Sequence, residues 1–68
     1  METEIYESDP FTPKKERLLA KLETPYRFER NDELFIQNGD GQVKIRIMHV
    51  RVAIRNDTLS REILGLKL

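Results

Sequence analysis

One run of thirteen residues, VKIRIMHVRVAIR at 43–55, limits the folds open to this chain more than any other feature. In its first half, residues 43–47, the apolar side chains are at odd positions, and in its second half, residues 50–54, they are at even positions. Alternation of apolar and charged side chains is typical of a β-strand with one buried face. The run therefore predicts a strand in which the inward-facing positions change parity at Met48 and His49.

A straight strand of this length does not fit inside a chain of 68 residues. At roughly 3.3 Å per residue the run would span about 43 Å, whereas a compact chain of this size has a diameter of about 28 Å. A β-bulge adds one residue, bends the strand and turns the following side chains to the other face. We therefore expect a bulge or sharp corner within Ile47–Val50, with the charged positions of both halves on the outer face. The alternative is a sheet completed only in a dimer, where half of the strand pairs across subunits.

The sequence NGDG at 38–41 is the strongest turn signal in the chain. Asn and Gly tolerate positive φ, so these residues predict a hairpin between a strand at 33–37 and the start of the long run. Upstream, residues 26–29 alternate between aromatic and charged side chains, which predicts a further short strand.

The segment TPKKERLLAKLE, residues 12–23, is predicted to be a helix of about three turns. Thr12 can cap the free amides and Pro13 suits the first helical position. Leucines then recur at i, i+1 and i+4 to form one stripe. Pro25 ends the helix, because the residue before a proline is pushed out of the helical region.

The C-terminal segment allows two interpretations. A helix over residues 58–64 would have Asn56 or Asp57 as its cap and Gly65 near its end. A strand would instead use the alternating leucines at the end of the chain. We expect the short helix, followed by an extended apolar tail.

The first eleven residues are expected to form a flexible acidic tail, because residues 1–12 contain four acidic and no basic side chains and show no period. Three large apolar residues in it, Ile5, Tyr6 and Phe11, are candidate contacts of a tail that becomes ordered on a partner. The alternative is a tail that lies loosely on its own domain. Residues 12–68 then form a single α+β domain. In this domain the N-terminal helix packs on a small, strongly bent, half-open barrel-like antiparallel sheet, with the short helix at the C-terminal end.

The chain contains no cysteine and one histidine, and its net charge is zero. Disulfides and thiolate metal sites are therefore excluded. No apolar stretch approaches the roughly 18 residues of a membrane span, and the acidic start differs from a signal peptide, so we expect a soluble, cytoplasmic protein without membrane contact. No groups of residues resemble a catalytic, metal or cofactor site. We accordingly expect neither enzyme activity nor a cofactor.

Five residues of the long strand are candidate contacts with a partner or with nucleic acid, and they form a basic strip on the expected outer face: Lys44, Arg46, His49, Arg51 and Arg55. Such strips bind phosphates, but exposed strand positions also carry Lys and Arg for solubility and edge protection. The run contains no aromatic residue to stack on bases. We therefore expect a small regulatory module that binds another protein, and rank nucleic-acid binding second.

Self-association is also expected. A chain of this length buries only about 60% of the surface that its unfolded form exposes. The apolar end LGLKL and the long strand offer more apolar surface than one small core readily covers, and exposed apolar patches usually mark contacts. A dimer is the expected assembly.

The stretch GDGQVKIRIMHVRVAI resembles small RNA-binding regulators of the carbon-storage type, in which a Gly-Asp turn also opens a valine-rich strand. The resemblance covers under a third of the chain and lacks that family's connecting loop. No family is assigned from it, and no functional residue is carried over.

Overall fold

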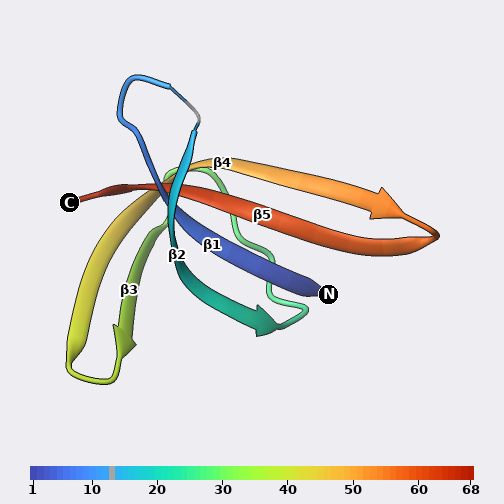
Figure 1. Ribbon diagram of the computed structural model, residues 1–68, viewed down its shortest axis with the longest axis horizontal. Coiled ribbons are helices and arrows are strands. Elements are labelled where there is room, and N and C mark those ends of the chain that lie inside the picture. The colour runs from blue at the N-terminus through green and yellow to red at the C-terminus, as the bar shows by residue number, and fades with distance from the viewer. Residues whose placement is uncertain (13) are drawn as a thin grey trace.

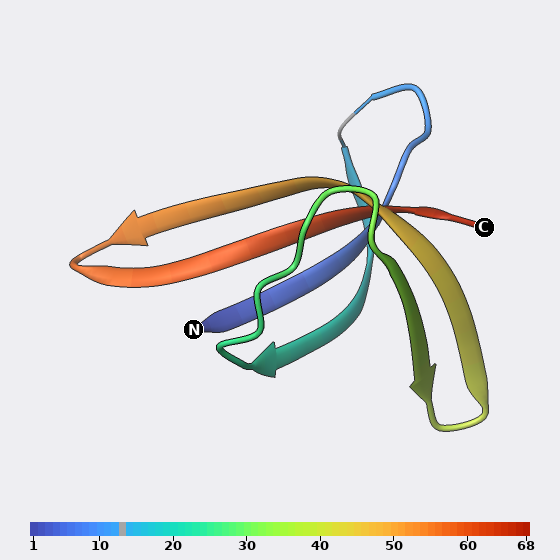
Figure 2. The ribbon, with the colours of Figure 1, turned by 180° about the vertical axis from the view of Figure 1, so that it is seen from behind.

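The computed structural model describes residues 1–12 and 14–68, which contain a single five-stranded sheet (Figure 1). The strands are β1 (Glu2–Ser8), β2 (Lys15–Glu23), β3 (Glu33–Asn38), β4 (Gly41–Arg55) and β5 (Thr58–Lys67). Their order across the sheet is β2-β1-β5-β4-β3. Neighbouring strands are antiparallel except β1 and β5, which are parallel. The sheet curls into a half-barrel, as the views from the two sides show (Figures 1 and 2).

The predicted α+β class is wrong, because the described chain is all-β. Residues 15–23, predicted as the N-terminal helix, form the edge strand β2; the helical position predicted for Pro13 lies outside the described residues. In β2, Leu18 pairs with Tyr6 and Ala20 with Ile5, so Leu19 is an extra residue between them. This bulge accounts for the adjacent leucines that resembled a helical stripe. The helix preference of such a segment is weak, and pairing with a distant strand overrides it.

The predicted C-terminal helix is also absent, and the alternative, a strand with alternating leucines, is the observed structure. Asn56 and Asp57, predicted as helix caps, have φ values of 51° and 63° and form the two-residue turn between β4 and β5. A type I′ hairpin turn requires positive φ at both central residues, and Asn and Asp tolerate it. The same two residues therefore join strands instead of starting a helix.

Two further predictions fail near the N-terminus. We expected residues 1–11 to form a flexible tail, whereas Glu2–Ser8 is β1, paired with β2 on one side and with β5 on the other. Residues 26–29, predicted as a strand, belong to an irregular segment that crosses from β2 to β3. Within residues 1–12 and 14–68, no helix has the length and apolar character needed to cross a membrane.

The predictions for the middle of the chain are confirmed. β3 and β4 form a hairpin at residues 38–41, where Gly39 has a φ of 63°. The predicted interruption of the long strand is present: Ile47 pairs with Gly65 and His49 pairs with Leu64, so Met48 is the extra residue. β4 bends strongly over its length (Figure 1). The prediction of a strongly bent sheet is therefore correct, although the sheet is mixed and not purely antiparallel.

The core lies on the inner face of the half-barrel. Five buried residues form it, with partly buried neighbours that include Phe28 and Ala20; the five are Ile5, Leu19, Ile45, Ile47 and Ile63. Fully burying one such side chain contributes about 1.5–3 kcal/mol. Leu64 is also fully buried but lies on the outer face, in register with Tyr6 and His49. Both halves of β4 direct apolar side chains inward, but only the first half reaches the core.

Candidate functional site

The hairpin of β4 and β5 extends beyond the core and has two chemically different faces. Its residues alternate regularly from Val50 to Arg55, and each pairs with a residue of β5 between Thr58 and Ile63. The bulge at Met48 sets which side chains face inward in this part of the hairpin. On β4 the apolar residues occupy the inner face and the basic residues the outer one, whereas on β5 the inner face also carries Arg61. Figure 1 shows this hairpin reaching past the other strands.

Four apolar side chains on the inner face of the hairpin are exposed. Val50 is 37%, Val52 58% and Ile54 71% exposed, and Leu59, opposite Ile54, is 40% exposed. We call these four residues the apolar face. Burying apolar surface is favourable by about 25 cal/mol per Å², so a row of four exposed branched side chains is a surface that gains free energy when a partner covers it.

Arg61 marks the boundary between the core and the apolar face. Its side chain is buried, it pairs with Val52, and its guanidinium carbon lies 4.9 Å from the centre of the Phe28 ring. Arg61 donates from Nε to Oγ1 of Thr3 at 2.7 Å and from Nη2 to the carbonyl oxygen of Thr24 at 3.1 Å. It therefore holds the segment that crosses from β2 to β3 against the inner face of the sheet.

Tyr26 adds an exposed aromatic ring close to this boundary. It is 59% exposed, and its ring packs edge-on against Phe28 with 4.8 Å between the ring centres. Aromatic residues are enriched in the buried parts of protein interfaces. Tyr26 is therefore an exposed aromatic residue on the segment that Arg61 holds.

The five basic residues predicted as a strip share the outer face of β4. Lys44 and Arg46 lie opposite Phe35 and Glu33 of β3, and beyond the bulge His49, Arg51 and Arg55 lie opposite residues of β5. All five side chains are exposed. The five residues therefore share one face, as the alternation predicted. The bulge at Met48 returns the basic side chains of the second half of β4 to the face on which Lys44 and Arg46 lie.

Acidic side chains on the same face offset much of this positive charge. Glu33 lies 3.2 Å from Nη2 of Arg46 and 3.4 Å from Nζ of Lys44. Hydrogen bonds from Arg46 and Lys44 hold the pKa of Glu33 below its usual value. Arg51 lies opposite Glu62 in the register of β4 and β5. The basic strip therefore has carboxylates beside three of its members.

Glu62 is also held by β2. Nζ of Lys15 donates to Oε2 of Glu62 at 2.6 Å and lies 5.0 Å from the centre of the Tyr6 ring. The hydrogen bond to Glu62 raises the pKa of Lys15. These contacts cross from β2 to β5 over the outer side of β1. The ring of Tyr6, one of the predicted tail contacts, therefore already interacts with a cation of its own chain.

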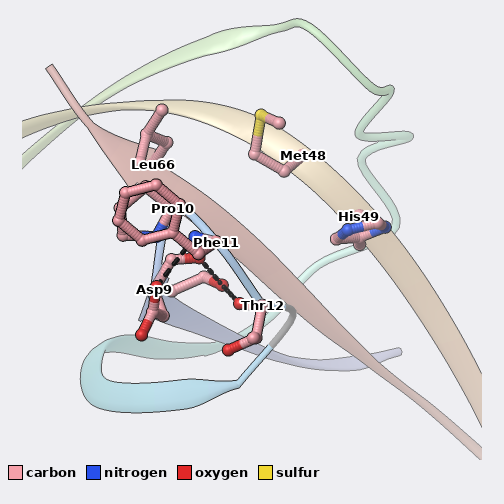
Figure 3. A pocket seen from close by; sticks show the side chains of 8 residues that line it. Asp9, Pro10, Phe11, Thr12, Met48, His49 and Leu66 are labelled. Carbon is pink, nitrogen blue, oxygen red and sulfur yellow. Dashed lines mark hydrogen bonds between the residues drawn. The ribbon is translucent and has the colours of Figure 1, made fainter.

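The other predicted tail contacts are placed very differently from one another. Ile5 is in the core, which leaves it unable to touch a partner, whereas Phe11 is 92% exposed in the loop after β1. Within this loop, the backbone N–H of Phe11 donates to Oδ1 of Asp9 at 2.8 Å (Figure 3). The loop lines one side of a cavity of about 100 Å³ whose other side is Met48, His49 and Leu66. Sites for drug-sized ligands are usually about 300–1,000 Å³.

A second hollow of about 290 Å³ lies where the half-barrel is open. Leu18 and Leu19 of β2 line one side, and Ile36 of β3 and Val43 of β4 line the other. Its lining combines leucine and isoleucine with Arg17, Asn38 and Gln42 and has no nucleophile or acid–base pair. Among the described residues, no three His, Cys, Asp or Glu side chains are grouped to hold a metal ion.

No protein-family model matches this chain, and no curated protein or solved structure is detectably similar to it. The apolar face of the hairpin was not located from sequence, although an excess of apolar surface on the long strand was part of the basis for expecting self-association. The signal was the length of the run, since a strand of about 43 Å is longer than a small core can cover.

Proposed function

We propose that this chain is a small, non-enzymatic regulatory module that binds another protein through the apolar face of the β4–β5 hairpin. The observation that carries the proposal is the uncovered row formed by Val50, Val52, Ile54 and Leu59. Exposed Tyr26, on the segment that Arg61 holds, is the kind of aromatic residue that often anchors such contacts. The proposal sets this activity in the cytoplasm, in line with the expectation from sequence.

The composition of the two faces favours this function over nucleic-acid binding. A phosphate must compete with Glu33 for Lys44 and Arg46, because that carboxylate already lies within 3.4 Å of both cations. The outer face also lacks a row of aromatic rings, since Phe35 is the only exposed aromatic side chain on β3 and β4. Stacking on such rings is a main source of single-strand affinity.

Affinity capture with matched baits tests the proposal. The wild-type chain, a Val52→Lys/Ile54→Lys variant and an Arg51→Gln/Arg55→Gln variant are each incubated with nuclease-treated native lysate. We expect a protein that the wild type and the Gln variant retain and that the Lys variant loses, because lysines on the inner face oppose burial of that face. Far-UV circular dichroism of each bait controls for folding. Retention of the same proteins by all three baits would reject the apolar face as the binding surface.

Nucleic-acid binding through the basic strip is the second candidate, and a salt titration discriminates it. Four phosphate contacts on single-stranded nucleic acid predict that log K falls with log salt at a slope near −3, from about −0.7 per contact. We expect no submicromolar binding of labelled single- or double-stranded oligonucleotides at physiological salt. Submicromolar binding that Lys44→Gln/Arg46→Gln/Arg51→Gln/Arg55→Gln abolishes would promote the second candidate above the first.

A further inference from the structure

The second half of β4 is an open edge of the sheet. β3 pairs with β4 only up to Arg46, and beyond it Ile47 exchanges backbone hydrogen bonds with Asn31 and Asp32 at 2.8 Å. From Met48 to Arg55 no strand of the described chain lies along β4 on the side away from β5. A strand edge of this kind is a template for pairing with another chain.

This edge lacks several of the devices that usually prevent such pairing. Residues 48–55 contain no proline, no glycine and no lysine, and the inner face carries only apolar side chains between Val50 and Ile54. Charged residues pointing inward, prolines and further bulges are the common protections of an edge strand. Valine and isoleucine in addition favour the extended conformation.

We propose that two copies of this chain pair through antiparallel β4 edges, centred on Val52, to form one continuous ten-stranded sheet. The inference rests on the proposed function, because it identifies a second copy as one partner of the same hairpin. Val52 then lies opposite Val52 of the second copy, and Val50 lies opposite Ile54. Antiparallel pairing about a two-fold axis leaves both apolar faces on the same side of the sheet. A further protein partner would meet an apolar face of twice the length.

The charges along the open edge select this register. Pairing centred on Val52 joins residues 49–55 of both copies, which is the stretch between the turn and the hydrogen bonds made by Ile47. Centring on Arg51 would join residues 48–54, a stretch of the same length that leaves Ile47 bonded to residues 31 and 32. It would, however, place two copies of Arg51 opposite each other, and like charges directly opposite are destabilising.

The outer face fits the same register. Arg51 of each copy lies opposite the small Ala53 of the other, so the two central arginines are separated along the strands. A register with Val52 opposite Arg51 of the second copy would place apolar and basic positions opposite each other. The two apolar faces would then lie on opposite sides of the sheet. His49 and Arg55 are opposite each other only at the ends of the pairing.

A pair of charge variants tests this register. Ala53→Glu introduces a carboxylate opposite Arg51 of the second copy, whereas Ala53→Lys introduces a second cation. Each opposite-charge pair across an antiparallel ladder changes association by about 0.2–1 kcal/mol, and the dimer has two such pairs. Dimerisation is therefore expected to strengthen with Glu and weaken with Lys, each by between about twofold and 30-fold, by sedimentation equilibrium. Equal dimerisation constants for both variants would overturn the register.

Single-cysteine cross-linking gives a second test that uses the whole chain, which has no cysteine of its own. Val52→Cys places two thiols in directly opposite positions, where Cα atoms lie about 4.5–5.5 Å apart, within the range that a disulfide allows. Ile54→Cys is the matched control, because its two copies are four residues out of register, or about 13 Å apart along the strand.

We expect mild oxidation to convert Val52→Cys into a disulfide-linked dimer, while Ile54→Cys alone stays reduced. A mixture of Val50→Cys chains and Ile54→Cys chains should also cross-link, because these two positions are opposite each other in the proposed register. Equal cross-linking of Val52→Cys and Ile54→Cys, or none with Val52→Cys, would overturn the inference. The proposed function is judged separately by affinity capture. Wild-type chain that sediments as an 8.1 kDa monomer at micromolar concentration and still captures its protein would refute only the edge pairing.

Discussion

Gly65 of β5 lies so close to Ile45 of β4 that a Cβ atom added to it would stand 3.0 Å from Cγ1 and 3.1 Å from Cβ of Ile45, and nearer still to Cδ1. Ile45 is fully buried and belongs to the core cluster, so its side chain is surrounded by other core residues. The absent side chain at Gly65 therefore allows the two strands to close over the core where β4 bends.

Replacing Gly65 by alanine should destabilise the fold by about 1–3 kcal/mol, because a methyl group forced into a packed core displaces its neighbours. Urea unfolding measures this change. The matched control is Gly41→Ala, whose Cβ would meet only the carbonyl oxygen of Asn38 at 3.4 Å, and which should change stability little. Ile45→Val removes the nearest atom, so it should lower the cost of Gly65→Ala in the double variant. A Gly65→Ala chain as stable as wild type would contradict the packing described.

Deleting residues 1–8 should abolish the fold, because it removes the strand that joins β2 to β5. Far-UV circular dichroism of the truncated chain should show loss of the sheet signal. In the intact chain, backbone ¹⁵N order parameters for Thr3–Glu7 should be near about 0.85, the value of rigid backbone. Values below about 0.6 in this segment, or a truncated chain that keeps its sheet, would restore the prediction of a flexible tail.

Arg61→Met should lower the free energy of unfolding by about 3 kcal/mol or more, because it removes two hydrogen bonds from a charged group, each contributing about 1.5–3 kcal/mol, while most of the apolar stem is retained. Arg61→Lys should recover only part of this loss, since an ammonium group cannot reach Thr3 and Thr24 as a planar fork does. Urea unfolding of the three chains measures both effects. Unchanged stability of Arg61→Met would show that the segment over the inner face does not depend on Arg61.

Glu33 should make the stability depend on pH in the acidic range. Its pKa in the folded chain is held below the usual 4.5 by hydrogen bonds from Arg46 and Lys44. A carboxyl group with a lowered folded pKa stabilises the fold at pH values above its unfolded pKa, and this contribution is lost as the pH falls through the folded pKa. Carbon-detected NMR titration of the Glu33 carboxyl should show the lowered pKa, and Arg46→Gln should raise it. An identical titration curve in wild type and Arg46→Gln would exclude this cause.

The parts of the fold that sequence reasoning predicted correctly are those with local signals. The turn at 38–41 has the residue types that positive φ requires, and the parity change at Met48 is visible as a change in alternation. Both are properties of a few adjacent residues. The basic strip followed directly from them, because the register of one strand determines which side chains share a face.

The errors arose where a strand is specified by a distant partner. β1 and β5 are parallel neighbours from opposite ends of the chain, and nothing within Glu2–Ser8 indicates that pairing. β2 has helix-forming residues and a bulge at Leu19 that imitates a helical stripe. The Asn56-Asp57 pair is suited to both a helix start and a type I′ turn. For these segments the choice is made by tertiary contacts, which local propensity does not record.

The apolar face was not located from sequence, because alternation alone does not distinguish a buried position from an uncovered one. Val52 and Ile54 have the same pattern as Ile45 and Ile47, yet the first two are more than half exposed and the other two are fully buried. The difference depends on which other strands lie over the inner face. That information resides in the strand order and not in the run itself.

Calorimetric titration of the purified captured protein tests whether the apolar face of the β4–β5 hairpin is the binding surface. The wild-type chain, Ile54→Lys and Arg55→Gln are compared at the same concentration and salt. We expect Ile54→Lys to weaken binding by at least about tenfold, the effect of losing an interface hot spot, while Arg55→Gln binds like the wild type. Equal affinities of wild type and Ile54→Lys, with loss of binding by Arg55→Gln, would contradict it and assign the interaction to the basic strip.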